Sequence, residues 1–335
     1  MARIAIFEVE EWERETFADL ARAHDVVFRE ETLEAGNAGE AAGAEVLSTF
    51  IYSRLTREVL EPFENLKLIA TRSTGFDHVD LDTCEERGIQ VANVPSYGEN
   101  TVAEHVFALL GAISHNIVAA ADRTRRGDFS HEGLQGFDLK GRTLGVVGTG
   151  HIGRWAARIA RGYGMEVLAF DVKPDEEAAR EIGFAYVAMD ELLARSDVVT
   201  LHVPGSEKTK HLISRDEFAK MKDGSVLINT ARGPVVDVDA LLHALASGKL
   251  RAAGLDVLPQ EPVVREEAEL LRTYFRKEHK LDTLLADHIL LRLSNVVITP
   301  HTAFDTKEAV QRILDTTHDN IAGFLEGEPR NVVNG

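Results

Sequence analysis

The sequence predicts an α/β protein of two domains, each with a mostly parallel sheet flanked by helices. The chain has 335 residues, and one hydrophobic core usually serves about 150 residues, so the length predicts two domains. Short apolar runs alternate with helical patterns along the whole chain, which is typical of parallel sheets covered by helices. The third observation is a glycine-rich turn between one apolar run and a helix.

Each predicted strand is a short apolar run with turn or polar residues at its ends. The strands are expected at 3–7, 45–49, 67–71, 89–92, 143–147, 165–170, 197–203, 225–229, 251–255 and 295–298. The clearest helices are expected at 10–22, 101–120, 151–163, 237–247 and 305–326. The long helix from Thr101 follows a turn-rich segment and is the expected domain junction. The charged segment 263–292 has neither glycine nor proline, and we interpret it as an exposed insertion.

Composition limits the partners. The formal net charge is -18, so nucleic acid and anionic membrane surfaces would be repelled, and neither is expected as a partner. The simplest interpretation of this charge is an adaptation for solubility. The sequence has no run of about 18 or more apolar residues, so no membrane span is predicted. Cys84 is the only cysteine, and no signal-peptide pattern opens the chain, so a cytoplasmic protein without disulfides is expected.

Residues 143–153, Thr-Leu-Gly-Val-Val-Gly-Thr-Gly-His-Ile-Gly, predict a dinucleotide site. Gly148, Gly150 and Gly153 form the pattern G-x-G-x-x-G between an apolar strand and an amphipathic helix. The first glycine permits a tight turn, and the second lets a pyrophosphate approach the backbone. The third lets the helix pack closely on the strand.

The residues beside this turn strengthen the interpretation. The helix N-terminus, at His151 and Ile152, presents free amides to phosphate charge. Asp171 ends the next strand, where its carboxylate can accept hydrogen bonds from the adenosine ribose hydroxyls. A carboxylate there repels a 2′-phosphate, so NAD is favoured over NADP, although Lys173 lies close by. The complete strand–turn–helix–strand–Asp unit predicts a Rossmann-type NAD domain.

Three later strands are each followed by polar residues, and in a parallel sheet such strand ends meet at one edge. These residues are Arg232, Asp256 with Glu261, and His301. Each alone has an ordinary structural interpretation, but together they suit the reduction of a 2-oxo acid. An imidazole is an acid and base near neutral pH, and a neighbouring carboxylate favours its protonated form. A guanidinium can pair with the substrate carboxylate and polarise the carbonyl. No metal site is predicted.

These motifs resemble the D-isomer-specific 2-hydroxyacid dehydrogenases over nearly the whole chain. The matching segments are Gly-Thr-Gly-His-Ile-Gly with Asp171, Asn-Thr-Ala-Arg-Gly with Arg232, Leu-Asp-Val-x-x-x-Glu-Pro with Glu261, and Pro-His-Thr-Ala with His301. The resemblance implies that Arg232, Glu261 and His301 are catalytic, with the last two as an acid/base pair. It also implies an NAD-binding domain at 101–299, inserted into a discontinuous, flavodoxin-like substrate domain of 1–100 and 300–335.

The same resemblance, strongest toward D-lactate dehydrogenases, implies further site residues. Substrate would be bound by the amides of Ser73, Thr74 and Gly75 and by the aromatic residues Tyr52, Tyr97 and Phe304. The cofactor would be flanked by His202, Val203, Pro204, Thr230 and Ala231, and Asp256 would hold its carboxamide. Members of this family usually form dimers, so a homodimer through the long helix near Thr101 is expected.

The implied reaction interconverts a small, pyruvate-like 2-oxo acid and the D-2-hydroxy acid with NAD as cofactor. Two alternatives stay open on sequence grounds. One is a dehydrogenase of another 2-hydroxy acid, because the three aromatic residues suggest a compact pocket without defining its volume. The other is an NAD(H)-sensing binding module, related to transcriptional corepressors, that does not turn substrate over.

Overall fold

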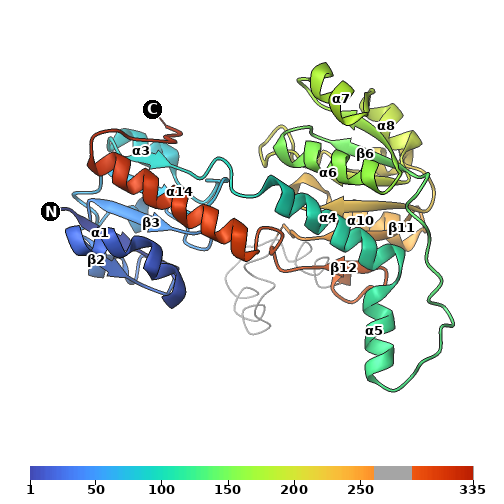
Figure 1. Ribbon diagram of the computed structural model, residues 1–335, viewed down its shortest axis with the longest axis horizontal. Helices are drawn as coiled ribbons and strands as arrows, with labels where there is room; N and C mark the ends of the chain where they lie inside the picture. The colour runs from blue at the N-terminus through green and yellow to red at the C-terminus, as the bar shows by residue number, and fades with distance from the viewer. Residues whose placement is uncertain (260–288, 335) are drawn as a thin grey trace. The chain divides into compact units, whose positions relative to one another are not determined.

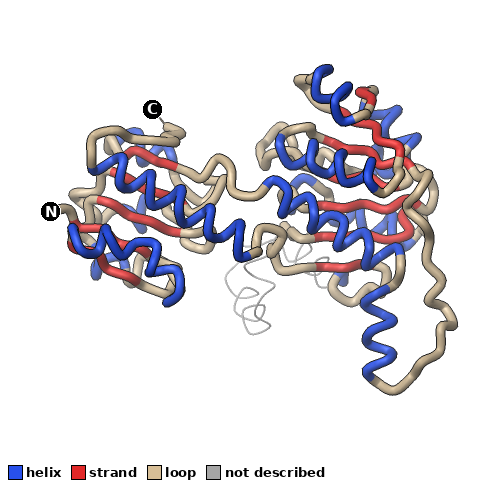
Figure 2. Tube along the Cα trace, viewed as in Figure 1, coloured by secondary structure: helices blue, strands red, loops and turns tan. Residues whose placement is uncertain are grey.

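The computed structural model describes residues 1–259 and 289–334. They form two compact units, one of Met1–Gly98 with Thr306–Gly335 and the other of Glu99–Asp305. Each unit is a parallel sheet with helices packed on it (Figures 1 and 2), so the α/β prediction is confirmed. Most of the predicted insertion at 263–292 lies outside the described residues.

The sheet of the first unit has five parallel strands in the order β2-β1-β3-β4-β5. The strands are β1 (Arg3–Ile6), β2 (Asp25–Phe28), β3 (Val46–Thr49), β4 (Leu68–Thr71) and β5 (Gln90–Ala92). The helices are η1 (Glu11–Phe17), α1 (Ala18–Ala23), η2 (Ala38–Ala41), α2 (Arg57–Leu60), α3 (Leu81–Glu86) and α14 (Lys307–Leu325). This is the flavodoxin-like order, and in such sheets ligands bind where the order reverses, here between β1 and β3.

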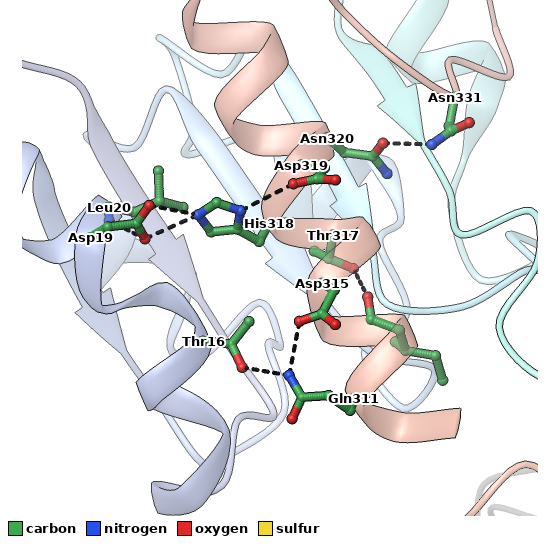
Figure 3. A network of polar contacts seen from close by, with 11 residues as sticks. Thr16, Asp19, Leu20, Gln311, Asp315, Thr317, His318, Asp319, Asn320 and Asn331 are labelled. Atoms are coloured by element: carbon green, nitrogen blue, oxygen red, sulfur yellow. Dashed lines mark hydrogen bonds and ion pairs between the residues drawn. The ribbon is translucent and has the colours of Figure 1, made fainter. Parts of the chain in front are cut away.

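The C-terminal helix α14 completes the first unit. It contacts β4 and the η1 segment near the N-terminus. Figure 3 shows the side chains of α14 that meet Thr16, Asp19 and Asn331. His318 Nε2 lies 2.9 Å from Asp19 Oδ2. The buried Asn320 donates to the carbonyl of Asn93 at 2.8 Å and accepts from the side chain of Asn331 at 2.8 Å. Residues from both ends of the chain therefore stabilise one unit.

The sheet of the second unit has seven parallel strands in the order β12-β11-β10-β9-β6-β7-β8. The strands are β6 (Thr143–Val147), β7 (Glu166–Phe170), β8 (Ala185–Tyr186), β9 (Val198–Leu201), β10 (Ser225–Asn229), β11 (Leu250–Leu255) and β12 (Val296–Ile298). The helices are α4 (Glu99–Ser114), α5 (Ile117–Arg125), α6 (His151–Gly162), α7 (Glu176–Ile182), α8 (Met189–Arg195), α9 (Arg215–Lys220), η3 (Gly233–Val235) and α10 (Val238–Ala246). The order reverses between β6 and β9, which is the Rossmann arrangement that the sequence predicts.

The sequence patterns miss two strands and misjudge one helix. The strand β2 has no fully buried residue and β8 has only two residues, so neither shows the buried apolar run by which most of the other strands are recognised. The helix expected at 101–120 is instead α4 and α5, because Asn116 between them has the left-handed φ of 52°.

Among the described residues no single helix is long and apolar enough to cross a membrane. The α4–α5 pair meets those limits only together, bent by 62°.

The only cysteine of the chain, Cys84, is fully buried in the core of the first unit. Burial raises the pKa of its thiol to about 11. The thiolate is the reactive form of cysteine, so this side chain acts as a small apolar residue at neutral pH.

Candidate active site

The turn after β6 leaves an open space at the N-terminus of α6. Gly148 has a φ of 93°, and a Cβ there would lie 2.6 Å from the carbonyl oxygen of His202. A Cβ at Gly153 would lie 2.0 Å from the carbonyl oxygen of Gly148. Gly150 differs, because a Cβ added to it would meet no heavy atom within 4 Å. The outer two glycines therefore shape the turn, and Gly150 leaves the space that a pyrophosphate needs.

The helix that follows this turn begins at His151, with Ile152 next to it, so their amides lie in the first turn of α6. Asp171 follows β7, the neighbouring strand. Its Oδ2 accepts from the amide of Thr149 at 2.7 Å, and its Oδ1 accepts from the amide of Lys173 at 2.8 Å. The glycine turn and the acidic residue are thus joined directly.

The carboxylate of Asp171 is held in its charged form. Desolvation acts to raise its pKa, but hydrogen bonds from Lys173 and Thr149 outweigh that effect, and the pKa is lowered. A carboxylate that is ionised at neutral pH can accept from ribose hydroxyls and repels a 2′-phosphate. The negative charge at this position therefore favours NAD over NADP.

The residues after β9 lie at the same sheet edge as the glycine turn. The amide of His202 donates to the carbonyl of Val147 at 2.8 Å, which joins the ends of β9 and β6, and Val203 and Pro204 continue from there. The Nε2 atom of His202 lies 3.0 Å from Thr200 Oγ1. Burial lowers the pKa of His202 to about 4, so its imidazole is neutral at pH 7.

The residues after β10 include a hydroxyl that is free to bind a ligand. Thr230 Oγ1 is buried and has no hydrogen-bond partner within the residues that the structure describes. The amide of Ala231 donates to the side chain of Asn229 at 3.0 Å, and the guanidinium of Arg232 donates to the carbonyl of Ala231 at 2.8 Å. Buried hydroxyls are normally hydrogen-bonded, so Thr230 fits a site that a polar ligand completes. Together with the open space at Gly150, this supports dinucleotide binding.

The backbone around His301 is held by the buried carboxylate of Asp256. Asp256 Oδ1 accepts from the Thr299 hydroxyl at 2.5 Å and from the amide of Thr302 at 2.9 Å, and Oδ2 accepts from the amide of Ala303 at 3.0 Å. The amide of His301 donates to the main-chain carbonyl of Asp256 at 2.9 Å. His301 has a φ of 56°, a conformation that a non-glycine residue keeps only where its surroundings impose it.

The sequence implies that Asp256 holds the nicotinamide carboxamide. In the structure its side chain is 1% exposed and both oxygens accept hydrogen bonds from the protein, so its observed task is to position the His301 turn. The carboxamide contact stays a prediction.

Sequence reasoning missed His105 on α4, whose Nε2 lies 2.9 Å from Thr299 Oγ1 and 3.4 Å from Asp256 Oδ1. A signal existed, because His105 stands at helical spacing from the buried Val102 and Leu109, where an apolar residue is expected.

The loop expected to bind a substrate carboxylate follows β4 in the first unit. Ser73 Oγ donates to the carbonyl of Gly75 at 2.6 Å, and Thr74 Oγ1 donates to the carbonyl of Val94 at 2.6 Å. The amides of Ser73, Thr74 and Gly75 donate no hydrogen bond within 1–259 and 289–334. A rigid loop with free amides is suited to an anion.

The aromatic candidates lie on both units. Tyr52 follows β3, is 46% exposed and packs edge-on against Phe50, with ring centroids 5.7 Å apart. Tyr97 follows β5, and its carbonyl accepts from the Arg312 side chain of α14. Phe304 belongs to the second unit, where its ring centroid lies 6.5 Å from that of His301. The chain re-enters the first unit only at Thr306, although the sequence suggests a border at residue 300.

The structure thus sorts the predicted residues into two sets. The second unit gathers the glycine turn, Asp171, His202, Thr230, Arg232 and His301 at the carboxyl edge of its sheet. The first unit gathers Tyr52, the Ser73–Gly75 loop and Tyr97 at the carboxyl edge of its own sheet. Glu261 lies outside the described residues, so its pairing with His301 stays a prediction.

The Rossmann sheet, the glycine turn and the acidic residue after β7 define an NAD-binding protein of the doubly wound α/β class. The model of the D-isomer specific 2-hydroxyacid dehydrogenase, NAD binding domain, matches residues 107–303. The chain belongs to this family of NAD-dependent enzymes.

Relatives that match along most of the chain carry different substrate names. The D-lactate dehydrogenase of Escherichia coli is 36% identical, covering 97% of this chain and 98% of the relative. The glycerate dehydrogenase of Methylorubrum extorquens is 39% identical, covering 82% and 81%. The structure of Aquifex aeolicus D-lactate dehydrogenase with NAD and lactic acid has a TM-score of 0.87 at 36% identity, covering 99% of each chain.

Replacing Gly150 and Gly153 by alanine separates cofactor binding from folding. In Gly150→Ala the new methyl has room in the protein but occupies the pyrophosphate space, so the Kd for NAD rises at least about tenfold while stability changes by no more than about 1 kcal/mol. In Gly153→Ala the methyl collides with backbone, which costs about 3 kcal/mol or more. Calorimetric titration and thermal unfolding measure the two effects. Wild-type NAD affinity in Gly150→Ala would contradict the assignment.

His202 should make stability depend on pH. The pKa of His202 in the folded protein, about 4, lies below its value of about 6.5 in the unfolded chain. Its contribution to the free energy of unfolding is therefore complete above pH 6.5 and is lost as the pH falls toward 4. Urea unfolding of wild type and His202→Asn measures this. Between pH 7 and pH 5 the wild type should lose about 2 kcal/mol more than the variant. Parallel stability curves would show that His202 does not titrate in this way.

Proposed function

We propose that the protein reduces a 2-oxo acid of about the size of pyruvate to the D-2-hydroxy acid and catalyses the reverse reaction, acting as a D-lactate dehydrogenase. One observation carries this proposal. His301 is held in a strained conformation by Asp256, at the sheet edge that also holds the glycine turn and Arg232. An acid/base group fixed in this way beside a nicotinamide site suits carbonyl reduction.

Each residue has a defined task in this proposal. Bound NADH supplies the hydride that the carbonyl carbon accepts. His301 holds a proton on its imidazole and donates it to the keto oxygen, which becomes the hydroxyl of the product. Arg232 pairs with the substrate carboxylate and polarises the carbonyl, while Glu261 favours the charged imidazole. The free amides of the Ser73–Gly75 loop bind the substrate carboxylate.

The choice of lactate and pyruvate rests on two supports. The Escherichia coli relative is a D-lactate dehydrogenase, and the Aquifex aeolicus relative was crystallised with lactic acid. In addition, the aromatic ring of Tyr52 stands at the end of β3, where it would limit the substrate side chain to a small group. The glycerate dehydrogenase relative makes hydroxypyruvate the main competing substrate.

Variants of the catalytic residues test the reaction. His301→Ala should lower kcat/KM with pyruvate by about 10²–10⁴-fold, the usual contribution of a general acid or base. Arg232→Ala should lower it by about 10²–10³-fold. His131→Ala, in an exposed loop of the same unit, is the control and should match the wild type. NADH oxidation is followed at varied pyruvate and saturating NADH, and a kcat/KM of His301→Ala within tenfold of the wild type would contradict the assignment.

A substrate panel tests the finer proposal. Pyruvate should give a higher kcat/KM than glyoxylate, hydroxypyruvate or phenylpyruvate. NAD binding without turnover of any of these acids would instead indicate an NAD-sensing module.

We also propose that the protein is a homodimer through the face of the second unit formed by α4, α5 and α6. On α5 the side chains of Ile117 and Val118 are about half exposed, and the rings of Trp155 and Tyr163 on and after α6 are similarly exposed. Figure 1 shows α5 extending away from the sheet of its own unit. Apolar surface of this kind marks an interaction site, and the resemblance to a usually dimeric family favours a second copy as the partner.

A charge placed on this face tests the dimer. Val118→Glu should shift the protein to monomer at micromolar concentration in sedimentation velocity, because an interface buries an unpaired carboxylate only at high cost. Val172→Glu, at an 85% exposed valine elsewhere in the same unit, should leave the dimer intact. A monomeric wild type would overturn this proposal.

A further inference from the structure

Glu8 stands at the point of the first sheet where a ligand crevice is expected. It follows β1, while Tyr52 and Ser53 follow β3, and the strand order reverses between these two strands. The backbone of Glu8 has a φ of 56°, which is unfavourable for glutamate and easy for glycine. A strained residue at a switch point indicates that its side chain is needed there.

The carboxylate of Glu8 holds the backbone of the next strand end. Oε1 accepts from the amide of Ser53 at 2.8 Å and from the Ser53 hydroxyl, and Oε2 accepts from the amide of Tyr52 at 3.1 Å. Ser53 is fully buried, and its hydroxyl accepts from the amide of Leu33 at 2.8 Å. One side chain therefore fixes the two residues that determine where the exposed Tyr52 ring leaves the chain.

The backbone of Glu8 also contacts the strand that leads into the predicted carboxylate loop. The guanidinium of Arg72, only 2% exposed, donates to the carbonyls of Glu8 at 2.5 Å and Phe7 at 2.7 Å and to Ser48 Oγ at 3.2 Å. Arg72 directly precedes Ser73. Glu8 and Arg72 thus join the ends of β1, β3 and β4, and two of these strands, β3 and β4, are followed by the predicted substrate residues Tyr52 and Ser73–Gly75.

We infer that Glu8 is a positioning residue that fixes the Tyr52 segment and so sets which 2-oxo acid side chains are accepted. The inference rests on the proposed function, because it takes Tyr52 to line the substrate pocket. A carboxylate is the group this position requires, since it must accept from two amides and a hydroxyl at once. A glutamine offers one acceptor oxygen and turns its own N–H donors toward the remaining donors.

Two variants test the inference. Glu8→Gln removes part of the acceptor set, and Glu8→Gly removes all of it while allowing a φ of 56° without strain. In both, the ratio of kcat/KM for pyruvate over phenylpyruvate should fall about tenfold or more, the scale of selectivity that apolar pocket walls provide. KM for pyruvate should rise while kcat stays within about threefold, because Glu8 has no part in the proton or hydride transfer.

Two controls exclude a general loss of structure. Glu11→Gln makes the same chemical change at an exposed position of the same unit and should keep the wild-type ratio. Partial unfolding would lower kcat without raising KM, which is the opposite of the expected pattern. The Kd for NAD should be unchanged in both Glu8 variants, because the glycine turn lies in the other unit.

Hydrogen–deuterium exchange separates this inference from the proposed function. The amides of Tyr52 and Ser53 should exchange at least about tenfold faster in Glu8→Gln, and this readout needs no turnover. If these amides exchange faster in Glu8→Gln but the wild type reduces none of the 2-oxo acids, the proposed function is refuted and Glu8 still holds the Tyr52 segment. An active Glu8→Gln with the wild-type ratio of substrates overturns the inference, as does unchanged exchange at both amides.

Discussion

The hydrogen bonds of the Asp256 carboxylate determine the conformation of the candidate catalytic segment. Asp256 follows β11 and accepts from residues that follow β12, so it joins the ends of two paired strands. Desolvation acts to raise the pKa of this carboxyl, but hydrogen bonds from His105, Thr299, Ala303 and Thr302 outweigh it, and the pKa is lowered. A buried carboxylate without these donors would cost several kcal/mol. The geometry at His301 is therefore a product of correct folding around this one charge.

The two units solve a common electrostatic problem in related ways. The chain carries a net charge of -18, while its cofactor and the proposed substrates are anions. The second unit presents helix amides at a glycine turn, with the guanidinium of Arg232 after a neighbouring strand. The first unit places the buried Arg72 directly before a loop of free amides. Local donors and fixed positive charge at the strand ends thus oppose the repulsion of the whole surface.

The sequence predicts the features of this protein that are local in the chain. The central strands are continuous apolar runs, and the glycine turn with Asp171 lies within one strand–helix–strand unit, so spacing alone reveals them. The family motifs likewise place Arg232 and His301 after strands. The edge strands β2 and β8 leave too weak a pattern because none of their residues is fully buried, and the break at Asn116 depends on a single residue.

Contacts that join distant segments could not be predicted. His105 meets Thr299 across most of the second unit's sequence, and Glu8 meets Ser53 across two intervening strands. Glu8 is not unusual in its own neighbourhood, and His105 stands out only as a polar residue at an apolar position of α4, so the partner of each is known only from the fold. The same holds for Asp256, whose motif suggests a ligand contact while its surroundings show a task inside the protein.

The buried, protonated thiol of Cys84 has a practical consequence. Since the chain has no other cysteine, the native protein offers maleimides and similar reagents almost no reactive sulfur. A cysteine introduced at an exposed position would then be the sole labelling site, without first removing the natural one. Two cysteines introduced in this way, one on each unit, would carry a fluorophore pair that reports the distance between the units in solution, with and without nucleotide.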